Sequence, residues 1–526
     1  MSHGGKYDIM WLIERYGPVP LKGATMFYFS KSRYCRFCQC PKSVWLQKNK
    51  PEEEVLSDDV FTRMTTGNEV GDLAMGIFGD YVEVTAYKED GRLDLEAMTG
   101  RTAEEMAKGT PVICEASFMY EGLYCAVDIL RKTDGGWAIY EVKSSTHDDK
   151  KVYFKDIAYQ RYVLERCGVN VTGTYLMVID NSYILDGELD ISRLFKITDV
   201  SSQISDDFSK VPENLKKAKE ILSMADEPDI DLSVNCLDPY KCSFWDYCTR
   251  DLPRPSVFDI YNLWKSKKFQ LYHMGVTTFE DLERVAPFTN KIQKRQVEYG
   301  LHNRGTYVEK ANIRKFLVEL HYPLYFLDFE SVQPAIPVYQ HSKPYAQIPF
   351  QYSLHYIERE GGSLEHREFL AESGTDPRRA IAESLCENIP ENGCILAYNK
   401  AFECTRIKEL AGLFPDLSGH LMTIEKHIID LVAPFREGAY YNRAMGGSFS
   451  IKSVLPAIFP DDPGLDYHNL EGVHNGTEAM NIFPQMEFMD EDERETARRN
   501  LLKYCELDTY ALVKIWQELV RVSAED

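Results

Sequence analysis

LYCAVDILRKTDGGWAIYEVKSS, residues 123–145, contains two runs of β-favouring residues joined by a DGG turn. Residues two apart on a strand point to the same face, so Glu141 and Lys143 in the second run can address a common point. Asp128 lies on the first run, one strand earlier. The stretch therefore predicts a strand pair that carries two carboxylates and an ammonium group. The alternative is a simple ion pair between Glu141 and Lys143 on an exposed strand.

The rest of the chain predicts an α/β protein with two α/β domains. Strand-like runs at 111–120 and 172–180 flank the opening stretch, and a helix with apolar residues at helical spacing follows the Glu141 strand. These elements predict a first domain over residues 26–250. A mainly helical segment is expected at 256–320, and a second α/β domain at 321–522 begins with the strand YPLYFLDFES.

Length and composition are those of a globular protein with several folding units. The chain has 526 residues, of which 44% are hydrophobic and 27% charged. This length suggests roughly three or four units. The net charge of −22 argues against a protein that coats nucleic acid by bulk electrostatics. It does not argue against a metal-dependent nuclease, because such an enzyme concentrates carboxylates in its site.

Targeting signals are not evident. The first residues, MSHGGKYDIM, contain no uncharged run long enough for a signal peptide, and no apolar stretch approaches the length needed to cross a bilayer. We therefore expect a soluble, cytoplasmic protein with no membrane partner. Thirteen cysteines without an export signal indicate metal binding or burial rather than a disulfide framework.

The charged groups of the opening stretch suit phosphodiester hydrolysis. Such hydrolysis uses a divalent cation held by carboxylates to activate water, and a lysine to position that water or stabilise developing charge. The order Asp128, then Glu141-x-Lys143, resembles the RecB-like branch of the PD-(D/E)XK nuclease superfamily. The resemblance implies that Asp128 and Glu141 bind Mg²⁺ or Mn²⁺ and that Lys143 supports the attacking water. It also implies that Glu115 in CEASF and Gln160 in IAYQRYVL complete the pocket.

Two positions depart from the pattern of that branch. Many relatives carry a metal-binding histidine where this chain has Gly71, and a tyrosine four residues after the glutamine, where this chain has Leu164. We therefore expect the affinity or specificity for metal to differ from that of those relatives.

Six cysteines fall into two groups, CRFCQC (Cys35, Cys38, Cys40) and CLDPYKCSFWDYC (Cys236, Cys242, Cys248). SKSRYCRFCQCPKSVWL resembles the start of RecB-like nucleases that carry an iron–sulfur cluster, with one cysteine before the nuclease core and three after it. The resemblance implies a [4Fe–4S] cluster on Cys40, Cys236, Cys242 and Cys248 that ties the ends of the domain together. Zinc is an alternative, because the first C-x5-C gap is wide. Cys35 or Cys38 could take the place of Cys40, and buried thiols without any ligand are a third reading.

A second set of carboxylates lies in the C-terminal half. FLDFES places Asp328 and Glu330 two apart on a strand, and KYCELDTYAL places Tyr504 and Asp508 four apart on a helix, so each pair shares a face. Between them, AYNKAFECTRIKEL ends a strand and opens a helix with Glu403. Three or four carboxylates that meet at one point can hold two metal ions, which activate water and stabilise the leaving oxygen.

The order D-x-E, then N-x-x-F-acid, then Y-x-x-x-D resembles DnaQ-like 3′–5′ exonucleases of the RNase H-like fold, in the variant with tyrosine in the third motif. The resemblance implies that Asp328, Glu330, Glu403 and Asp508 bind metal and that Tyr504 orients the water. Relatives usually have aspartate at the position of Glu403, so the motif also fits a weakened exonuclease.

Together these motifs predict a metal-dependent nuclease that joins a PD-(D/E)XK domain to an RNase H-like exonuclease domain. We expect it to act on single- or double-stranded DNA, with RNA as the alternative substrate, in DNA repair or in defence against foreign DNA. No motif names a protein partner. A different hypothesis is a nucleic-acid-binding or assembly subunit whose exonuclease half is degenerate.

Overall fold

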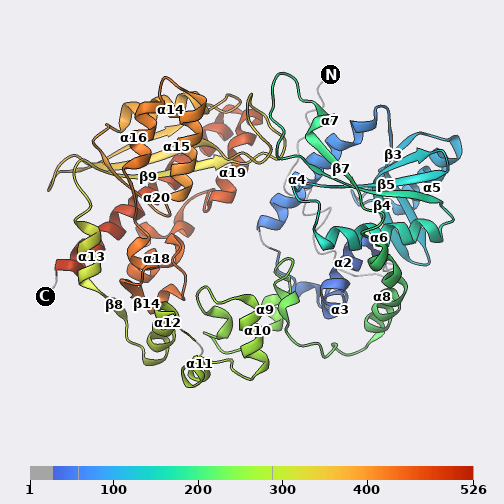
Figure 1. Ribbon diagram of the computed structural model, residues 1–526, viewed down its shortest axis with the longest axis horizontal. Helices are drawn as coiled ribbons and strands as arrows, with labels where there is room; N and C mark the ends of the chain where they lie inside the picture. The colour runs from blue at the N-terminus through green and yellow to red at the C-terminus, as the bar shows by residue number, and fades with distance from the viewer. Residues whose placement is uncertain (1–27, 57, 287, 289, 525–526) are drawn as a thin grey trace. The chain divides into compact units, whose positions relative to one another are not determined.

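The computed structural model of the protein describes residues 28–56, 58–286, 288 and 290–524. The first two residues of the predicted first domain, and the N-terminal residues MSHGGKYDIM, lie outside this described part. The chain divides into two compact units (Figure 1): one extends to Asp251 and includes Ala335–Tyr345, and the other holds Leu252–Pro334 and the residues from Ala346 onward. Both units mix helices and strands, which confirms the α/β class.

The first unit is built on a seven-stranded sheet with the order β2-β3-β4-β5-β6-β7, in which β1 pairs with β4. Neighbours among β3, β4 and β5 are antiparallel, whereas β6 is parallel to β5 because a helix connects the two. The strands are β1 (Phe29–Ser30), β2 (Val82–Glu83), β3 (Val112–Tyr120), β4 (Leu123–Thr133), β5 (Gly136–Lys143), β6 (Val171–Ile179) and β7 (Phe195–Asp199).

Helices cover both faces of this sheet. Ile139 of β5 packs in one core with Tyr159 and Val163 of α6, and Tyr140 and Val142 pack in another with residues of α4. This alternation leaves Glu141 on the face that α6 covers. The helices are α2 (Lys31–Gln39), α3 (Pro41–Asn49), α4 (Asp58–Ala74), α5 (Leu95–Lys108), α6 (Lys151–Arg166), α7 (Ile191–Leu194), α8 (Ser205–Ser223) and α9 (Trp245–Cys248).

Residues 335–345 belong to the first unit although they come from the second half of the chain. The His341 amide donates to the Leu185 carbonyl at 2.7 Å, and the Leu185 amide donates to the Ser342 carbonyl at 3.1 Å. Ala335 lies in the apolar core that includes α4. Backbone hydrogen bonds and burial therefore anchor this segment.

The second unit is built on a five-stranded sheet with the order β11-β10-β9-β12-β13. Neighbours among β9, β10 and β11 are antiparallel, and β12 is parallel to both β9 and β13. Figure 1 shows α14, α15 and α16 on one side of β9 and the long helix α20 on the other. The strands are β9 (Leu324–Val332), β10 (Ile348–Ile357), β11 (Leu364–Leu370), β12 (Cys394–Ala397) and β13 (Ile428–Asp430). A separate pair joins β8 (Thr306–Val308) to β14 (Tyr440–Asn442).

The segment expected to be mainly helical, residues 256–320, contains four α-helices in its described residues and groups with the second unit. Val257, Leu271, Phe279 and Val297 form a small core of their own there. The helices of the second unit are α10 (Lys265–His273), α11 (Phe279–Val285), α12 (Lys291–His302), α13 (Lys310–Leu317), α14 (Arg378–Asn388), α15 (Ala401–Leu413), α16 (Ser418–Lys426), α17 (Ala433–Arg436), α18 (Ile451–Ile458), α19 (Gly476–Gln485) and α20 (Glu491–Ala524). None of the helices in the described part is long and apolar enough to span a bilayer.

Candidate functional site

Three carboxylates converge on one face of β9, the central strand of the sheet in the second unit. Asp328 and Glu330 come from β9 and Asp508 comes from α20, and one carboxylate oxygen from each lies within 4.8 Å of the other two. The two β9 residues share a face because they are two apart, and α20 packs against that face. The structure therefore brings together three of the four acidic residues that the second constellation singled out.

Burial makes this cluster unfavourable when all its members are charged. Burial, and then the carboxylates of Asp508, Glu403 and Glu330, raise the pKa of Asp328 well above its usual range. Burial and Asp508 also raise the pKa of Glu330 to about 8, although Lys452 opposes the shift. Converging oxygens with unbalanced negative charge are the donor set that hard divalent cations such as Mg²⁺ and Mn²⁺ prefer, so these residues fit the expected ions.

Two tyrosines hold Asp508. The Tyr467 hydroxyl donates to Asp508 Oδ1 at 2.7 Å. Burial raises the pKa of Asp508 to about 6, and hydrogen bonds from Tyr467 and Tyr504 limit the shift. Tyr504 was expected from the sequence, but Tyr467 was not, because it lies in a short turn of 3-10 helix (Tyr467–Asn469) with no motif around it.

Glu403 stands apart from the group of three. It lies in the first turn of α15 and is buried, and its Oε2 has no hydrogen-bond partner among the described residues. Burial raises its pKa to about 8, with a further contribution from Asp430. Its charge reaches Asp328, whose pKa it raises. The structure thus places Glu403 near the cluster, but not within 4.8 Å of all three members.

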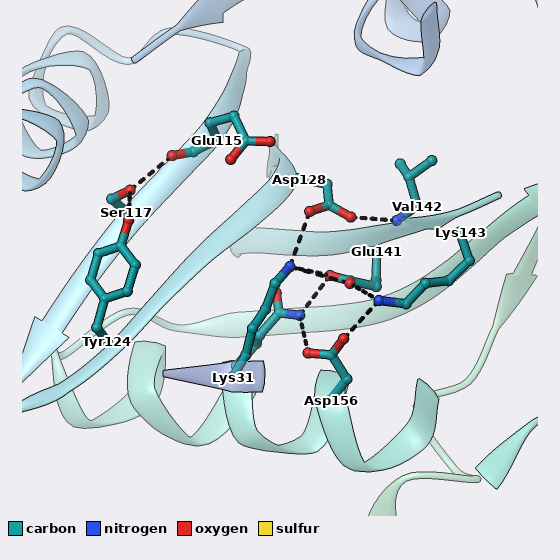
Figure 2. Close-up of polar contacts among 10 residues, drawn as sticks. Lys31, Glu115, Ser117, Tyr124, Asp128, Glu141, Val142, Lys143 and Asp156 are labelled. Atoms are coloured by element: carbon teal, nitrogen blue, oxygen red, sulfur yellow. Dashed lines mark hydrogen bonds and ion pairs between the residues drawn. The ribbon is translucent and has the colours of Figure 1, made fainter. Parts of the chain in front are cut away.

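In the first unit, Asp128 and Glu141 meet where β4 and β5 stop pairing. The ladder between these strands ends at the pair Ile129–Tyr140, and beyond it Asp128 Oδ2 accepts the Val142 amide at 2.7 Å. Figure 2 shows the Lys31 ammonium between the two carboxylates. Its Nζ lies 3.1 Å from Asp128 Oδ1 and 3.2 Å from Glu141 Oε1. Burial alone would lower the pKa of Lys31, but Asp128 and Glu141 raise it well above its usual value.

Lys143 lies between two further carboxylates. It forms ion pairs with Glu141 and, at 2.7 Å, with Asp156 of α6. Gln160, one turn along the same helix, donates to Glu141 Oε2 at 2.6 Å and to Asp156 Oδ1 at 3.0 Å. Although burial opposes its charge, Asp156 and Glu141 raise the pKa of Lys143. Asp156 was not among the residues predicted from the sequence, yet its i, i+4 spacing to Gln160 in DIAYQ was a usable signal.

Glu115 lies opposite Asp128 on β3, in a left-handed backbone conformation with φ of +56°. Burial, and then Asp128, raise the pKa of Glu115 to about 7. The five residues predicted for this site are therefore in one neighbourhood, and Lys31 and Asp156 join them. As arranged, the Lys31 ammonium takes the position between Asp128 and Glu141, so a cation fits there only when Lys31 moves away.

The two departures from the RecB-like pattern have simple structural contexts. Gly71 lies in α4, and no atom outside that helix's own backbone and its chain neighbours comes within 4 Å of a Cβ built there. Leu164 is fully buried in the core beneath α6, next to Val163. Apolar packing therefore takes the place of a tyrosine at this position.

Four cysteines from distant parts of the chain line one small pocket: Cys40, Cys236, Cys242 and Cys248. Cys40 precedes α3, whereas the other three lie in or near α9 and the loop before it. Cys35 and Cys38 have other neighbours, since Cys35 Sγ contacts the Val152 carbonyl at 4.0 Å and the Asn214 amide contacts Cys38 Sγ at 3.9 Å. Burial raises the pKa of Cys248 to about 11, and Lys42 opposes this shift.

The spacing of these sulfurs bears on the ligand they suit. One zinc ion with bonds of about 2.3 Å brings its four sulfurs to about 4 Å from one another. Within the described residues, the groups of three or more metal-ligating atoms that lie within 4.8 Å of one another contain no cysteine. A four-iron cluster spreads its thiolates further, because each binds a different iron. Four thiols that line one pocket are a donor set that either a [4Fe–4S] cluster or zinc uses.

One family model of unknown function matches part of the chain. Residues 325–450 match the family model described as "Domain of unknown function (DUF2779)". An uncharacterized protein of Mycoplasma pneumoniae is 26% identical over 208 residues, which cover 36% of this chain and 31% of the relative. An uncharacterized protein of Mycoplasma genitalium is 24% identical with the same coverage. The chain thus spans about 31% of the length of these curated relatives. No solved structure gives a significant match.

Proposed function

We propose that this protein is a metal-dependent nuclease with two separate hydrolytic sites. The observation that carries the proposal is the convergence of Asp328, Glu330 and Asp508 within 4.8 Å. The strand order of the second sheet supports it, because a third-second-first-fourth-fifth order with the first three strands antiparallel is expected of an RNase H-like fold. The family match covers Asp328, Glu330 and Glu403.

In the second unit the carboxylates would hold Mg²⁺ or Mn²⁺. Bound divalent ions supply an activated water and neutralise charge on the scissile phosphate. Asp328 and Glu330 fix the position from β9, and Tyr467 and Tyr504 hold the Asp508 carboxylate in place from two directions. Tyr504, which is hydrogen-bonded to Asp508, would orient the water. Lys452 of α18 lies close enough to lower the pKa of Glu330 and Asp508, so it is placed to contact a phosphate.

The first unit supports a PD-(D/E)XK site. Its strands β3, β4, β5 and β6, with α6 between the last two, have the order and directions that this superfamily needs. Lys143 is held between Glu141 and Asp156, so its ammonium is positioned to orient water. Asp128 and Glu141 would hold the cation after Lys31 withdraws from between them.

The four-cysteine pocket would hold a [4Fe–4S] cluster. The cluster would have a structural role, because its ligands come from distant parts of the chain, Cys40 before α3 and the others in or near α9. Zinc is the alternative ligand. DNA is the proposed substrate and RNA the alternative. DNA repair and defence against foreign DNA are the processes in which such an enzyme would act.

The test is cleavage of end-labelled and internally labelled single- and double-stranded DNA and RNA with Mg²⁺ or Mn²⁺. We expect Asp508→Asn to remove stepwise trimming and Lys143→Met to remove the other cleavage, each by at least about 100-fold, the magnitude typical of losing a group that stabilises a transition state. Asp492→Asn, at an exposed position of the same helix α20, and Lys132→Met, at an exposed position of β4, are the matched controls. Cleavage that survives in both site variants on every substrate would overturn the proposal.

A second candidate function rests on the position of Glu403. Since Glu403 is not within the group of three, the exonuclease-like half could bind nucleic acid or a partner without cutting. Under that hypothesis the wild-type protein binds labelled strands, yet Asp508→Asn changes no cleavage product.

A further inference from the structure

A second group of metal-ligating side chains lies in the second unit, outside the carboxylate cluster. His355 of β10 and His366 of β11 are direct cross-strand partners, and Glu506 comes from α20. One ligand atom from each lies within 4.8 Å of the other two. His355 is buried, His366 is half-buried and Glu506 is exposed, so the group opens to solvent on one side. No part of the proposed nuclease chemistry uses these three residues.

Hydroxyl groups orient both imidazoles. His355 Nδ1 is hydrogen-bonded to Thr509 Oγ1 at 2.8 Å, and His366 Nε2 is hydrogen-bonded to Ser353 Oγ at 2.9 Å. The two hydroxyls are hydrogen-bonded to each other at 2.6 Å. Metal-binding histidines are commonly held in this way, through the ring nitrogen that does not touch the metal. The arrangement leaves His355 Nε2 and His366 Nδ1 for a ligand.

We propose that His355, His366 and Glu506 form a binding site for one transition-metal ion of the Zn²⁺ class. Two imidazoles and one carboxylate suit Zn²⁺ and its first-row neighbours, whereas Mg²⁺ and Ca²⁺ prefer oxygen ligands. Three protein ligands leave a fourth position for water, which the exposed side of the group provides.

The ion would fix α20 to the sheet beside the carboxylate cluster. Thr509 follows Asp508 in α20, and Ser353 of β10 is the cross-strand partner of Asp328. An ion bound to β10, β11 and α20 together would therefore hold α20, which carries Asp508, against β10, which pairs with the β9 strand that carries Asp328. The competing explanation is that both histidines are ordinary core residues satisfied by Thr509 and Ser353.

Zinc titration of the full-length protein, freed of metal with a chelator and then kept in excess Mg²⁺, separates these explanations. The Mg²⁺ occupies the oxygen-rich sites, and any zinc bound by the cysteines is common to wild type and variants. We expect the wild type to bind one more Zn²⁺ per chain than His366→Asn, and Glu506→Gln to bind that ion at least about tenfold more weakly. Co²⁺ in place of Zn²⁺ should give visible absorption bands that are missing in His366→Asn.

The matched control is His468→Asn, since the side chain of His468 is 93% exposed and pairs only with Asp466 among the contacts described. We expect this variant to bind Zn²⁺ as the wild type does. Glu506→Gln changes an exposed side chain, so its result does not depend on folding of the core. Equal Zn²⁺ stoichiometry and affinity in the wild type, His366→Asn and Glu506→Gln would overturn the proposal, as would an equal loss in His468→Asn. Because the readout is metal binding, this outcome is independent of nuclease activity.

Discussion

Lys31 determines the charge balance around Glu141. Its ammonium contacts Asp128 and Glu141 from a position 97 and 110 residues earlier in the chain. β1 places it there, because Phe29 and Ser30 pair with Leu123 and Tyr124 of β4 and Lys31 follows directly. Glu141 is almost fully buried, and it accepts from Lys31, Lys143 and Gln160. Each buried oxygen of this carboxylate therefore has a partner.

We expect Lys31→Met to lower the free energy of unfolding by roughly 1–3 kcal/mol in a chelating buffer, because carboxylates that lose a partner bear a desolvation penalty. Mg²⁺ should restore more stability in this variant than in the wild type, since no ammonium competes for the position. Urea unfolding with and without Mg²⁺ measures both effects. Lys108→Met, which removes an exposed pair with Glu105, is the control and should change neither. An identical response to Mg²⁺ in Lys31→Met and wild type would contradict the expectation.

The carboxylate cluster of the second unit should make stability fall as pH rises when divalent ions are absent. The pKa of Glu330 in the folded protein is about 8, against 4.5 for an ordinary glutamate. Between these values the folded state keeps a proton that the unfolded state has lost, so each pH unit lowers the free energy of unfolding by about 1.4 kcal/mol for this group. Glu330→Gln removes that contribution. Urea unfolding from pH 5 to pH 8 should therefore show a shallower slope in the variant, and equal slopes would contradict the assignment.

At the residue scale, local sequence patterns identified the site residues that lie close together in the sequence. They missed the site residues that tertiary packing brings in from distant positions in the sequence. Asp128, Glu141 and Lys143 lie within one hairpin, and Asp328 with Glu330 lies on one strand, so their proximity follows from strand geometry. Lys31 and Tyr467 reach their carboxylates only through tertiary packing. Neither residue has a local pattern that distinguishes it from ordinary lysines and tyrosines, so the sequence alone could not assign them.

At the element scale, long elements with clear periodicity were predicted and short edge strands were not. The expected strands at 111–120 and 172–180 are confirmed as β3 and β6, and the two strands expected within residues 123–145 are confirmed as β4 and β5. β11, with the sequence LEHREFL, is mostly exposed and lacks apolar alternation. Its pairing with β10, rather than its own composition, makes it a strand.

The helix α4 offers a test of backbone propensity at Gly71, the position at which the RecB-like pattern has a histidine. Glycine in the interior of a helix is less stable than alanine by roughly 0.5–1 kcal/mol, and a Cβ at Gly71 meets nothing within 4 Å. Gly71→Ala should therefore raise the free energy of unfolding by about that amount. The contrasting variant is Gly300→Ala in α12, where a Cβ would lie 2.7 Å from the ring of Phe279. Gly300→Ala should therefore be destabilised. A loss of stability in Gly71→Ala would contradict the inference that a Cβ at Gly71 has space around it.

At the scale of the whole molecule, the sequence indicated one boundary but not the full division. The change of unit at Asp251 falls within DLPRPSVFD, where prolines and polar residues predict a boundary. The assignment of residues 335–345 to the first unit depends on hydrogen bonds from His341 and Gln340 to residues 185–187, which are more than 150 positions away. Local composition carries no signal for such contacts.

Hydrogen bonds around the cysteine pocket also join two distant segments of the first unit. Gln39, next to Cys40, donates to the carbonyls of Asn235 and Tyr240 at 2.8 Å each, and Arg36 donates to Ser243 at 3.0 Å. These hydrogen bonds hold the segment of Cys40 against the segment of the other three cysteines. The apolar core beside the pocket is small. Its buried residues are Trp45, Leu46, Phe244 and Tyr247.

A cluster bound to this pocket should therefore contribute much of the stability of the first unit. We expect protein purified without oxygen to be brown, with about four irons per chain. Cys242→Ser and Cys40→Ser should lose the visible absorption and unfold at lower temperature, because the cross-link between distant segments is gone. Cys38→Ser should keep both, since Cys38 contacts Asn214 instead of lining the pocket, and it tests directly which cysteine of CRFCQC is the ligand. Colourless protein with stoichiometric zinc would contradict the cluster, and loss of colour in Cys38→Ser with retention in Cys40→Ser would reassign the fourth ligand.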